Sequence, residues 1–293
     1  MKRRGKALLS FLLMGPSLLL LAFFFLFPTL GSVLISLTDR KLVGQNAAEI
    51  SFVGLNNYLH LFADSNLPRV LANTSILILS AVAIQQALGY FISRLLKDKA
   101  PRFRRIVHGS LYAGLLMPEA ATAFIFFLLF SFNGELNRLI AAAGGIPRVW
   151  LADRPLLIVC IALIWSGTAY SVITFENALD SLNESVSDSA RCDGAGLIRL
   201  HFGILIPAIR RTILANTTIL ALNGLGAFGL IFMLTGGGPL YRSTTLSVLV
   251  FRNAVSGSDV GYGLALSFLL FLISLSLGSL QAALLRSSSE NES

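Results

Sequence analysis

Six long stretches with almost no charged residues constrain the fold more than any other feature of this sequence. Five contain no Asp, Glu, Lys or Arg, and the sixth contains only Glu119. The five uncharged stretches are 7–38, 70–93, 155–175, 212–241 and 260–285, and the sixth is 106–134. Each is near or beyond the roughly 20 apolar residues that cross a bilayer as a helix. The chain is therefore predicted to be an all-α, polytopic membrane protein with six transmembrane helices.

The composition supports a membrane location and allows approximate bounds for the spans. Hydrophobic residues make up 55% of the chain and charged residues only 13%, whereas about 25% charged residues is typical of soluble proteins. We expect one membrane domain over residues 1–293. Its six spans are expected at about 9–37, 69–93, 106–132, 155–176, 207–234 and 260–285.

The distribution of basic residues predicts how the chain is oriented. The connections on alternate sides of the six spans divide the 23 Lys and Arg residues into 15 on one face and 8 on the other. Cytoplasmic connections carry the excess of Lys and Arg. The face with 15 holds both termini and the polar loop 181–206, which are therefore expected in the cytoplasm.

Charge and motif patterns argue against two other classes of protein. The net charge of +8 comes from residues at the ends of spans, where basic side chains fix topology and meet anionic headgroups. No nucleic-acid binding is expected, because no basic face with interleaved aromatic residues is present. The sequence also has no P-loop, no His or Cys cluster with metal-ligand spacing and no nucleophile with an evident base. The chain is therefore not expected to be an enzyme or to bind a metal or cofactor itself.

The polar loop 181–206 reads as a short helix with an exposed docking surface. Asn183 or Ser187 can cap the helix, and Gly194 can interrupt it because a residue without Cβ relaxes the backbone. Small side chains dominate one side of this segment, and these are Ser189, Ala190, Gly194 and Ala195. We expect such a surface to let another protein approach the backbone closely.

The spacing of this loop closely resembles the cytoplasmic signature of binding-protein-dependent ABC transporter permeases. The matching residues are Asp188, Ser189, Ala190, Asp193, Gly194, Ala195 and, further along, Pro207. The family pattern reads Glu-Ala-Ala-x-x-Asp-Gly-Ala, so Asp188 and Ser189 are departures that keep charge and small size. His201 stands where Phe is common. The resemblance implies that these residues form the coupling helix, which sits in a groove of the ATP-hydrolysing subunit.

Three other segments resemble the carbohydrate importers of the same family. They are Gly54 to Tyr58 after the first span, Gly134 to Asn137 after the third, and Thr235 to Pro239 after the fifth. The resemblance implies a maltose-permease-like fold and an importer for a sugar, oligosaccharide, polyol or sugar phosphate. Gly229 stands where many sugar permeases carry an acidic residue, so no polar solute contact is expected from that position.

The resemblance also implies the partners and the location. The chain is expected to pair with a second, homologous permease, two ATP-binding subunits that hold ATP and Mg, and an extracytoplasmic solute-binding protein. It is expected in the cytoplasmic (inner) membrane of a bacterial cell. Two alternatives stay open at this point: the same fold importing another organic solute, such as a polyanion, or a membrane assembly or sensor subunit that transports nothing.

Three polar residues inside the spans are candidates for the solute pathway. Glu119 follows Pro118 near the middle of the third span, and Asn216 and Asn223 lie in the fifth. An ionisable side chain at that depth is costly and usually faces a cavity or a partner group. Pro118 bends the helix there by removing a backbone hydrogen bond. Each of the three polar residues can contact a solute or brace neighbouring helices.

Overall fold

The computed structural model describes residues 13–44, 47, 49–97 and 99–290, and these residues are mostly helical. Apart from two isolated bridges, the described residues contain no β-strand. The basic N-terminal residues used for the orientation, Lys2, Arg3, Arg4 and Lys6, and the start of the expected first span lie outside the described residues. The chain divides into two compact units, one of residues 1–67 and 249–271 and one of residues 68–248 and 272–293.

In the first unit, a short helix holds the end of the first membrane helix. The unit includes η1 (Ala22–Leu26), α2 (Phe27–Ser36), α4 (Asn56–Ala63), η3 (Arg252–Ser256) and the beginning of α16 (Val260–Glu290). Asn57 Nδ2 donates hydrogen bonds to the carbonyl oxygens of Ser36 and Thr38, both at 2.8 Å. The hydroxyls of Tyr58 and Ser36 lie 2.7 Å apart. Since a helix end leaves carbonyls unpaired, the Asn57-Tyr58 pair satisfies and fixes the end of α2.

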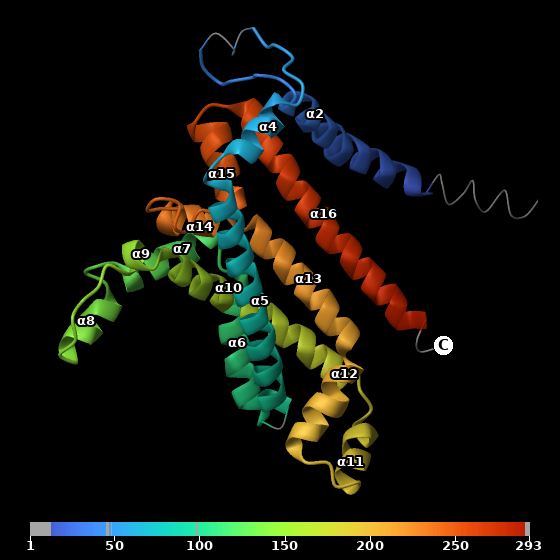
Figure 1. Cartoon of the computed structure of the whole chain (residues 1–293). Helices are drawn as coiled ribbons and strands as arrows, with labels where there is room; N and C mark the ends of the chain where they lie inside the picture. The colour runs from blue at the N-terminus through green and yellow to red at the C-terminus, as the bar shows by residue number, and fades with distance from the viewer. Residues whose placement is uncertain (1–12, 45–46, 48, 98, 291–293) are drawn as a thin grey trace, which may run out of the picture. The chain divides into compact units, whose positions relative to one another are not determined.

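The second unit contains most of the spans and the loop between the fourth and fifth of them (Figure 1). Its long helices are α5 (Leu67–Lys97), α6 (Pro101–Leu116), α7 (Glu119–Phe130), α10 (Pro155–Asp180) and α13 (Arg210–Gly226). Its short helices are α8 (Glu135–Ala142), α9 (Trp150–Asp153), α11 (Glu184–Cys192), η2 (Arg199–Leu205), α12 (Ile206–Ala208) and α14 (Phe228–Thr235). The first half of α15 (Leu246–Phe251) also belongs to this unit.

Helix α10 is the centre of the second unit. It packs against α6, α7, α13 and α14, and α7 packs against α14. The largest buried cluster draws side chains from α5, α7, α10 and α14, including Leu77, Phe126, Ile158, Leu163 and Ile231. Helix contacts in lipid depend on close packing rather than on apolar burial from water, so this cluster fixes how the broken helices described next are placed around α10.

Two of the expected spans are interrupted. Within the described part of the chain, five helices are long and apolar enough to cross a membrane, and a bent pair makes a sixth candidate. The expected third span, 106–132, is divided into α6 and α7 at Met117 and Pro118, whose backbone is extended (ψ 127° and 144°). Proline lacks the N–H of a continuous helix and disfavours the helical region for the residue before it. The expected bend at Pro118 is therefore a complete break.

The structure differs from the predicted fifth span, 207–234, at the start of that span. Pro207 was expected in the first turn of that span, but a helical segment already begins at Arg199 and includes Pro207 near its end. The chain then bends by 72° between Ala208 and Arg210. The missing N–H of Pro207 and the π-helical turn before it account for this, because both are common causes of helix kinks. A second break follows at Ala227, between α13 and α14.

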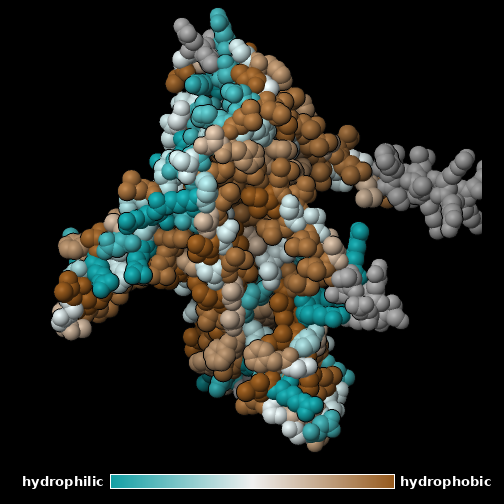
Figure 2. All heavy atoms as spheres, in the orientation of Figure 1, coloured by the Kyte–Doolittle hydropathy of each residue, from teal (hydrophilic) through white to brown (hydrophobic). Residues whose placement is uncertain are grey.

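The surface of the second unit is polar at the tip that carries α11. Figure 2 shows hydrophilic side chains on this tip and hydrophobic side chains along the helices that lead to it. This distribution is the one expected for a segment that leaves the membrane.

Candidate functional site

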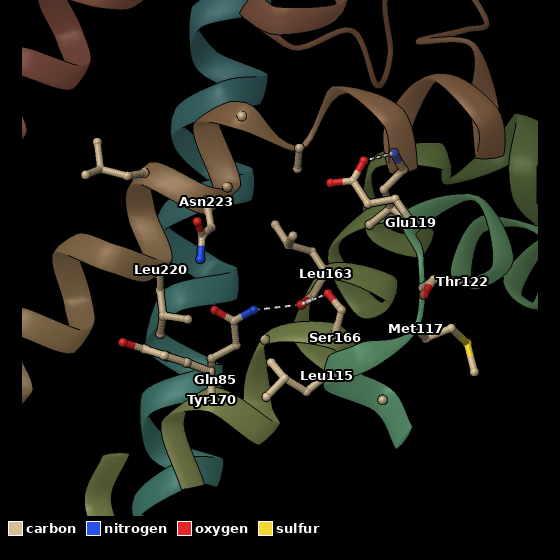
Figure 3. A pocket seen from close by; sticks show the side chains of 17 residues that line it. Gln85, Leu115, Met117, Glu119, Thr122, Leu163, Ser166, Tyr170, Leu220 and Asn223 are labelled. Carbon is tan, nitrogen blue, oxygen red and sulfur yellow. Dashed lines mark hydrogen bonds between the residues drawn. The ribbon is translucent and has the colours of Figure 1, made fainter. Parts of the chain in front are cut away.

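A pocket of about 410 Å³ lies where the two broken helices of the second unit meet α5 and α10. Its wall includes the break between α6 and α7 and the break between α13 and α14 (Figure 3). Most of the lining is apolar or glycine. The polar lining residues are Gln85, Glu119, Thr122, Ser166, Tyr170 and Asn223. Discontinuous helices are a common site of solute binding in transporters, because irregular backbone is tolerated at membrane depth only around a cavity or inside protein.

Glu119 is held in this pocket by the start of the neighbouring helix. It is the first residue of α7, and its Oε2 accepts the backbone N–H of Leu230 in the first turn of α14 at 3.0 Å. The residue that precedes α14, Ala227, offers no side-chain cap of its own. Glu119 therefore supplies from another helix the acceptor that an N-cap side chain normally provides.

The position of the Glu119 carboxylate depends on Gly229. A Cβ atom built on Gly229 would collide with Glu119 Oε2. The carboxylate thus occupies the space next to Gly229 that a side chain would otherwise fill. Gly229 has no side chain, but an acidic group lies beside it because Glu119 reaches there from α7.

The electrostatics of the pocket favour a negative group at this point. The N-termini of α7 and α14 both begin at the pocket, and a helix N-terminus carries partial positive charge. Glu119 lies in the first turn of one helix and binds the first turn of the other. Its side chain is exposed, and among the described residues the only hydrogen bond to it comes from Leu230. One carboxylate oxygen is therefore available to a solute.

The other polar groups present hydrogen-bond donors and acceptors without positive charge. Gln85 Nε2 donates to the carbonyl oxygen of Leu163 at 2.6 Å, and the Ser166 hydroxyl donates to the same oxygen at 3.0 Å (Figure 3). These bonds fix the Gln85 amide, so that its own oxygen is an oriented acceptor. Asn223 is exposed and approaches the pocket from the side opposite to Glu119.

Thr122 is the most unusual polar group of the wall. Its side chain is only 1% exposed, and its Oγ1 has no hydrogen-bond partner among the described residues. A buried hydroxyl without a partner is costly.

Of the three pathway candidates predicted from the sequence, the structure brings two together. Glu119 and Asn223 line the pocket, whereas Asn216 does not. Asn216 is 1% exposed, and its Nδ2 donates to Gln86 Oε1 at 2.7 Å and to Ser171 Oγ at 3.1 Å. Asn216 therefore braces α13 against α5 and α10, which was the alternative left open by the sequence.

The sequence prediction missed the remaining polar lining residues. Gln85 could have been noticed, because a carboxamide in an uncharged span is rare and costly unless it is bonded. Ser166 and Tyr170 carry no such signal, since both occur widely in membrane helices. Among the described residues, no group of three His, Cys, Asp or Glu side chains is placed to hold a metal ion.

The predicted coupling segment begins with a capped helix. The Asn183 side chain accepts the backbone N–H of Ser185 at 3.1 Å, so Asn183 is the N-cap of α11. Ser187, the other candidate cap, lies within the helix. Asp188 and Ser189 are exposed on it.

The end of α11 explains the Asp-Gly-Ala sequence of this segment. Gly194 has φ +78°, its N–H bonds to the carbonyl of Arg191, and the N–H of Ala195 bonds to the carbonyl of Ala190. These two bonds are the Schellman pattern, in which a residue in the left-handed region ends a helix. Glycine fits this position because other residues pay a steric cost there. Asp193 immediately precedes the turn and is exposed.

The small-residue surface predicted for docking is divided by the fold. Ala190 is buried and Ala195 is half-buried, and both pack inward against the end of α10 and against η2. The prediction that all four small residues face a partner was wrong for these two, because an apolar contact between them accompanies the Schellman turn. Ser189 and Gly194 are exposed, and no atom lies within 4 Å of a Cβ built on Gly194.

Helix α10 connects the pocket with the coupling segment. Leu163 and Ser166 line the pocket, and Phe175 and Leu179 further along the same helix belong to the buried cluster that holds α11 and η2. The cluster comprises Phe175, Leu179, Ala190, Leu200, Leu205 and Ile209. One buried cluster therefore joins α11 and η2 to α10.

His201, which replaces the Phe common in the family, keeps a ring contact and adds a hydrogen bond. Its ring packs edge-on against Tyr90, and Nδ1 lies 2.8 Å from the Tyr90 hydroxyl. The replacement thus fastens η2 to α5.

Apolar spans surround a pocket at two broken helices, and a polar helix lies outside the spans. This arrangement is that of a polytopic membrane transport protein. The chain belongs to the family described as binding-protein-dependent transport system inner membrane component, whose model matches residues 86–289. The recognition made from the coupling segment and the predicted all-α membrane fold are both confirmed.

Curated relatives and solved structures agree with this assignment. The chain is 27% identical over 285 residues to the sulfoquinovosyl glycerol transport system permease protein of Agrobacterium fabrum, covering 96% of this chain and 92% of that protein. It is 30% identical over 265 residues to the multiple sugar-binding transport system permease protein of Streptococcus mutans, covering 87% and 88%. It resembles in fold a chain of a bacterial alginate ABC transporter, with a TM-score of 0.78, 17% identity and coverage of 96% and 94%.

The chain is therefore a permease subunit of an ABC importer. Its relatives are transport subunits rather than enzymes, and ATP is hydrolysed in a separate subunit of such importers.

Proposed function

We propose that this chain provides one half of the membrane pathway for a neutral, hydroxylated solute of the sugar or polyol class, and that the central pocket is its part of that pathway. The observation that carries the proposal is the pocket itself. At two helix breaks it presents one carboxylate, two carboxamides and the hydroxyls of Ser166 and Tyr170 and, among its described lining residues, no basic side chain. Such groups match the donors and acceptors of a sugar hydroxyl.

The charge of the pocket supports a neutral solute over a polyanion. An anionic solute would meet the exposed Glu119 carboxylate without a basic residue of this chain to offset the repulsion, and unpaired like charges are costly in a region of low dielectric constant. The names of the relatives include a sugar-binding system, a glycoside of glycerol and an sn-glycerol-3-phosphate system, and they support a carbohydrate-type solute without deciding its charge. The charge of the pocket alone disfavours the sugar phosphate and polyanion alternatives.

The proposed mechanism places the chain in a larger assembly. A second homologous permease completes the pathway, an extracytoplasmic binding protein delivers the solute, and two ATP-binding subunits, which hold ATP and Mg, dock on the coupling segment. Both termini and the coupling segment lie in the cytoplasm, with the chain in the cytoplasmic membrane of a bacterium. The residues proposed to meet the ATPase are Asp188, Ser189, Asp193 and Gly194, with Ala190, Ala195 and Pro207 supporting them from within.

The force from ATP binding reaches the pocket along α10. Closure of the ATP-binding subunits moves α11, and the buried cluster around Phe175 and Leu179 passes this movement to α10. Because α10 also contributes Leu163 and Ser166 to the pocket, the pocket changes shape in step with the ATPase. A ligand or nucleotide shifts such an equilibrium only through contacts that differ between the two states.

The test is ATPase activity of the complete purified transporter in lipid, with its binding protein and with sugars, polyols, sugar phosphates and an acidic oligosaccharide added one at a time. We expect stimulation by one neutral hydroxylated compound. Stimulation only by an anionic compound would contradict the solute class, and no stimulation by any compound, with the ATPase still bound, would favour the assembly or sensor alternative.

A further inference from the structure

A second cavity of about 540 Å³ lies along the first turns of α6 and shares no lining residue with the central pocket. We call it the basic groove. Its lining residues are Lys99, Pro101, Arg104, Arg105, His108, Gly109 and Tyr112. Three of the seven are Lys or Arg, and a fourth is His, which can be protonated. This is a high density of ionisable side chains for a helix that enters a membrane.

The charges of the basic groove are only partly balanced within the chain. Glu176, on α10, is nearly buried and receives His108 Nε2 at 2.9 Å and Arg104 Nη2 at 3.6 Å. These contacts orient Arg104 and His108 at the edge of the groove. The side chains of Lys99 and Arg105 have no ion pair or hydrogen bond with any other described residue. The groove therefore holds an excess of positive charge that a ligand can neutralise.

The groove changes from basic to apolar along the helix. One face of α6 carries Arg104, Arg105, His108 and Tyr112. The helix extends about 16 Å along its axis from Pro101 to Tyr112. No atom lies within 4 Å of a Cβ built on Gly109, so the groove stays open at its middle. The neighbouring Ile106 is 70% exposed. A ligand that fits this gradient has an anionic head and an apolar stem.

We propose that the basic groove binds an anionic phospholipid, with the phosphate diester held by Lys99, Arg104 and Arg105 and the start of an acyl chain lying against Gly109 and Tyr112. Basic pockets beside membrane helices on the cytoplasmic side attract such headgroups, and tyrosine favours the interface between headgroups and hydrocarbon. A free phosphate ion has the same head chemistry but makes no use of the apolar end. An acidic protein segment would likewise leave that end unfilled.

The test is lipid binding to the complete purified transporter in detergent, measured by native mass spectrometry. The probe is phosphatidylglycerol. The reference lipid is phosphatidylcholine, which has no net charge, and the competitor is inorganic phosphate. Lys99→Ala and Arg105→Ala are each expected to weaken phosphatidylglycerol binding about fivefold. Arg102→Ala is the matched control, since Arg102 is exposed on the same turn but does not line the groove. It is expected to leave binding unchanged, and inorganic phosphate is not expected to displace the lipid.

Four results would overturn the proposal. Equal losses in all three variants would mean that general surface charge attracts the lipid. Equal binding of phosphatidylcholine would mean that the groove does not select an anion. Displacement by inorganic phosphate would assign the site to the free ion. Release of the ATP-binding subunits by Lys99→Ala or Arg105→Ala, with lipid binding intact, would assign it to a protein segment. None of these results depends on which solute is transported.

Discussion

The carboxylate of Glu119 caps α14 by accepting, at 3.0 Å, the N–H of Leu230, which lies 111 residues further along the chain. The bond joins the two breaks that open the central pocket. Because only one carboxylate oxygen is engaged, the same side chain can fix α14 and meet a solute. The two roles can be separated, since a cap requires an acceptor whereas a charged contact requires the negative charge.

Replacing the cap acceptor should destabilise the second unit modestly. Glu119→Ala removes the side chain that caps α14 and should lower the free energy of unfolding by about 1 kcal/mol, as loss of an N-cap does. Glu119→Gln keeps an oxygen that can accept the Leu230 N–H and should be close to the wild type. Thermal unfolding of the purified complex measures both. Equal stability of all three proteins would show that the bond is not a cap.

Gly229 and Glu119 should show coupling. Gly229→Ala places a methyl group against Glu119 Oε2, the end of a flexible and exposed side chain. The carboxylate should therefore move away and lose its bond to the Leu230 N–H, at a cost of about 1 kcal/mol. In a chain that already carries Glu119→Ala, the same substitution should cost much less, because the space is empty. The stabilities of the two single variants and the double variant form a double-mutant cycle. Additive effects would mean that the carboxylate does not occupy the place beside Gly229.

Substitutions at Gly194 should distinguish its role in the turn that ends α11 from its role in docking the ATP-binding subunit. Gly194→Ala should cost about 1–2 kcal/mol because of the left-handed backbone, and Gly194→Asn should cost less, since Asn tolerates that region better. Gly194→Trp should in addition obstruct the partner, because the side chain would project from an exposed position.

The measurement for Gly194 is solute-stimulated ATPase activity of the assembled transporter, with membrane insertion as the control. Activity should be kept by Gly194→Asn and lost in Gly194→Trp while insertion stays normal. Retained stimulation in Gly194→Trp would contradict docking at this point.

Asn216 and Asn223 should differ although both are polar residues of the same helix. Asn216→Ala removes the hydrogen bonds that Gln86 Oε1 and Ser171 Oγ accept. It should destabilise the protein by about 1–3 kcal/mol, with an unchanged KM for uptake by the complexes that assemble. Asn223→Ala should leave stability unchanged and raise the KM. Uptake assays normalised to the amount of assembled complex distinguish the two. The reverse pattern would show that the pocket has been assigned to the wrong side of α13.

The sequence predicted much of the helical framework, because membrane spans and their interruptions leave local signals. The uncharged stretches predicted the helices, Pro118 marked a break, and Asn183 was one of two predicted caps of α11. The break at Ala227 was not predicted. The chain there contains no proline, although Gly224, Gly226 and Gly229 surround it, and the bond between Leu230 and Glu119 contributes to its geometry. The same limit applies to Ala190 and Ala195, because a run of small residues does not show which of them pack inward.

For the site, the sequence identified Glu119 and Asn223 but not the geometry that makes them useful. An ionisable residue at membrane depth is conspicuous in any sequence. The bond to α14 and the space beside Gly229 arise from residues far apart in the chain, and no local pattern records them. The inward-facing role of Asn216 was equally invisible, because an asparagine that braces helices and one that binds a solute have the same sequence signature.

Uptake by Glu119→Gln tests the central claim most directly. The substitution keeps the cap and the shape of the side chain and removes only the charge that the pocket offers to a solute. With stability and assembly equal to the wild type, we expect uptake of the transported solute to fall about tenfold or more, as loss of a hydrogen bond to a charged group does. Uptake equal to the wild type would contradict the claim that this pocket is the solute pathway.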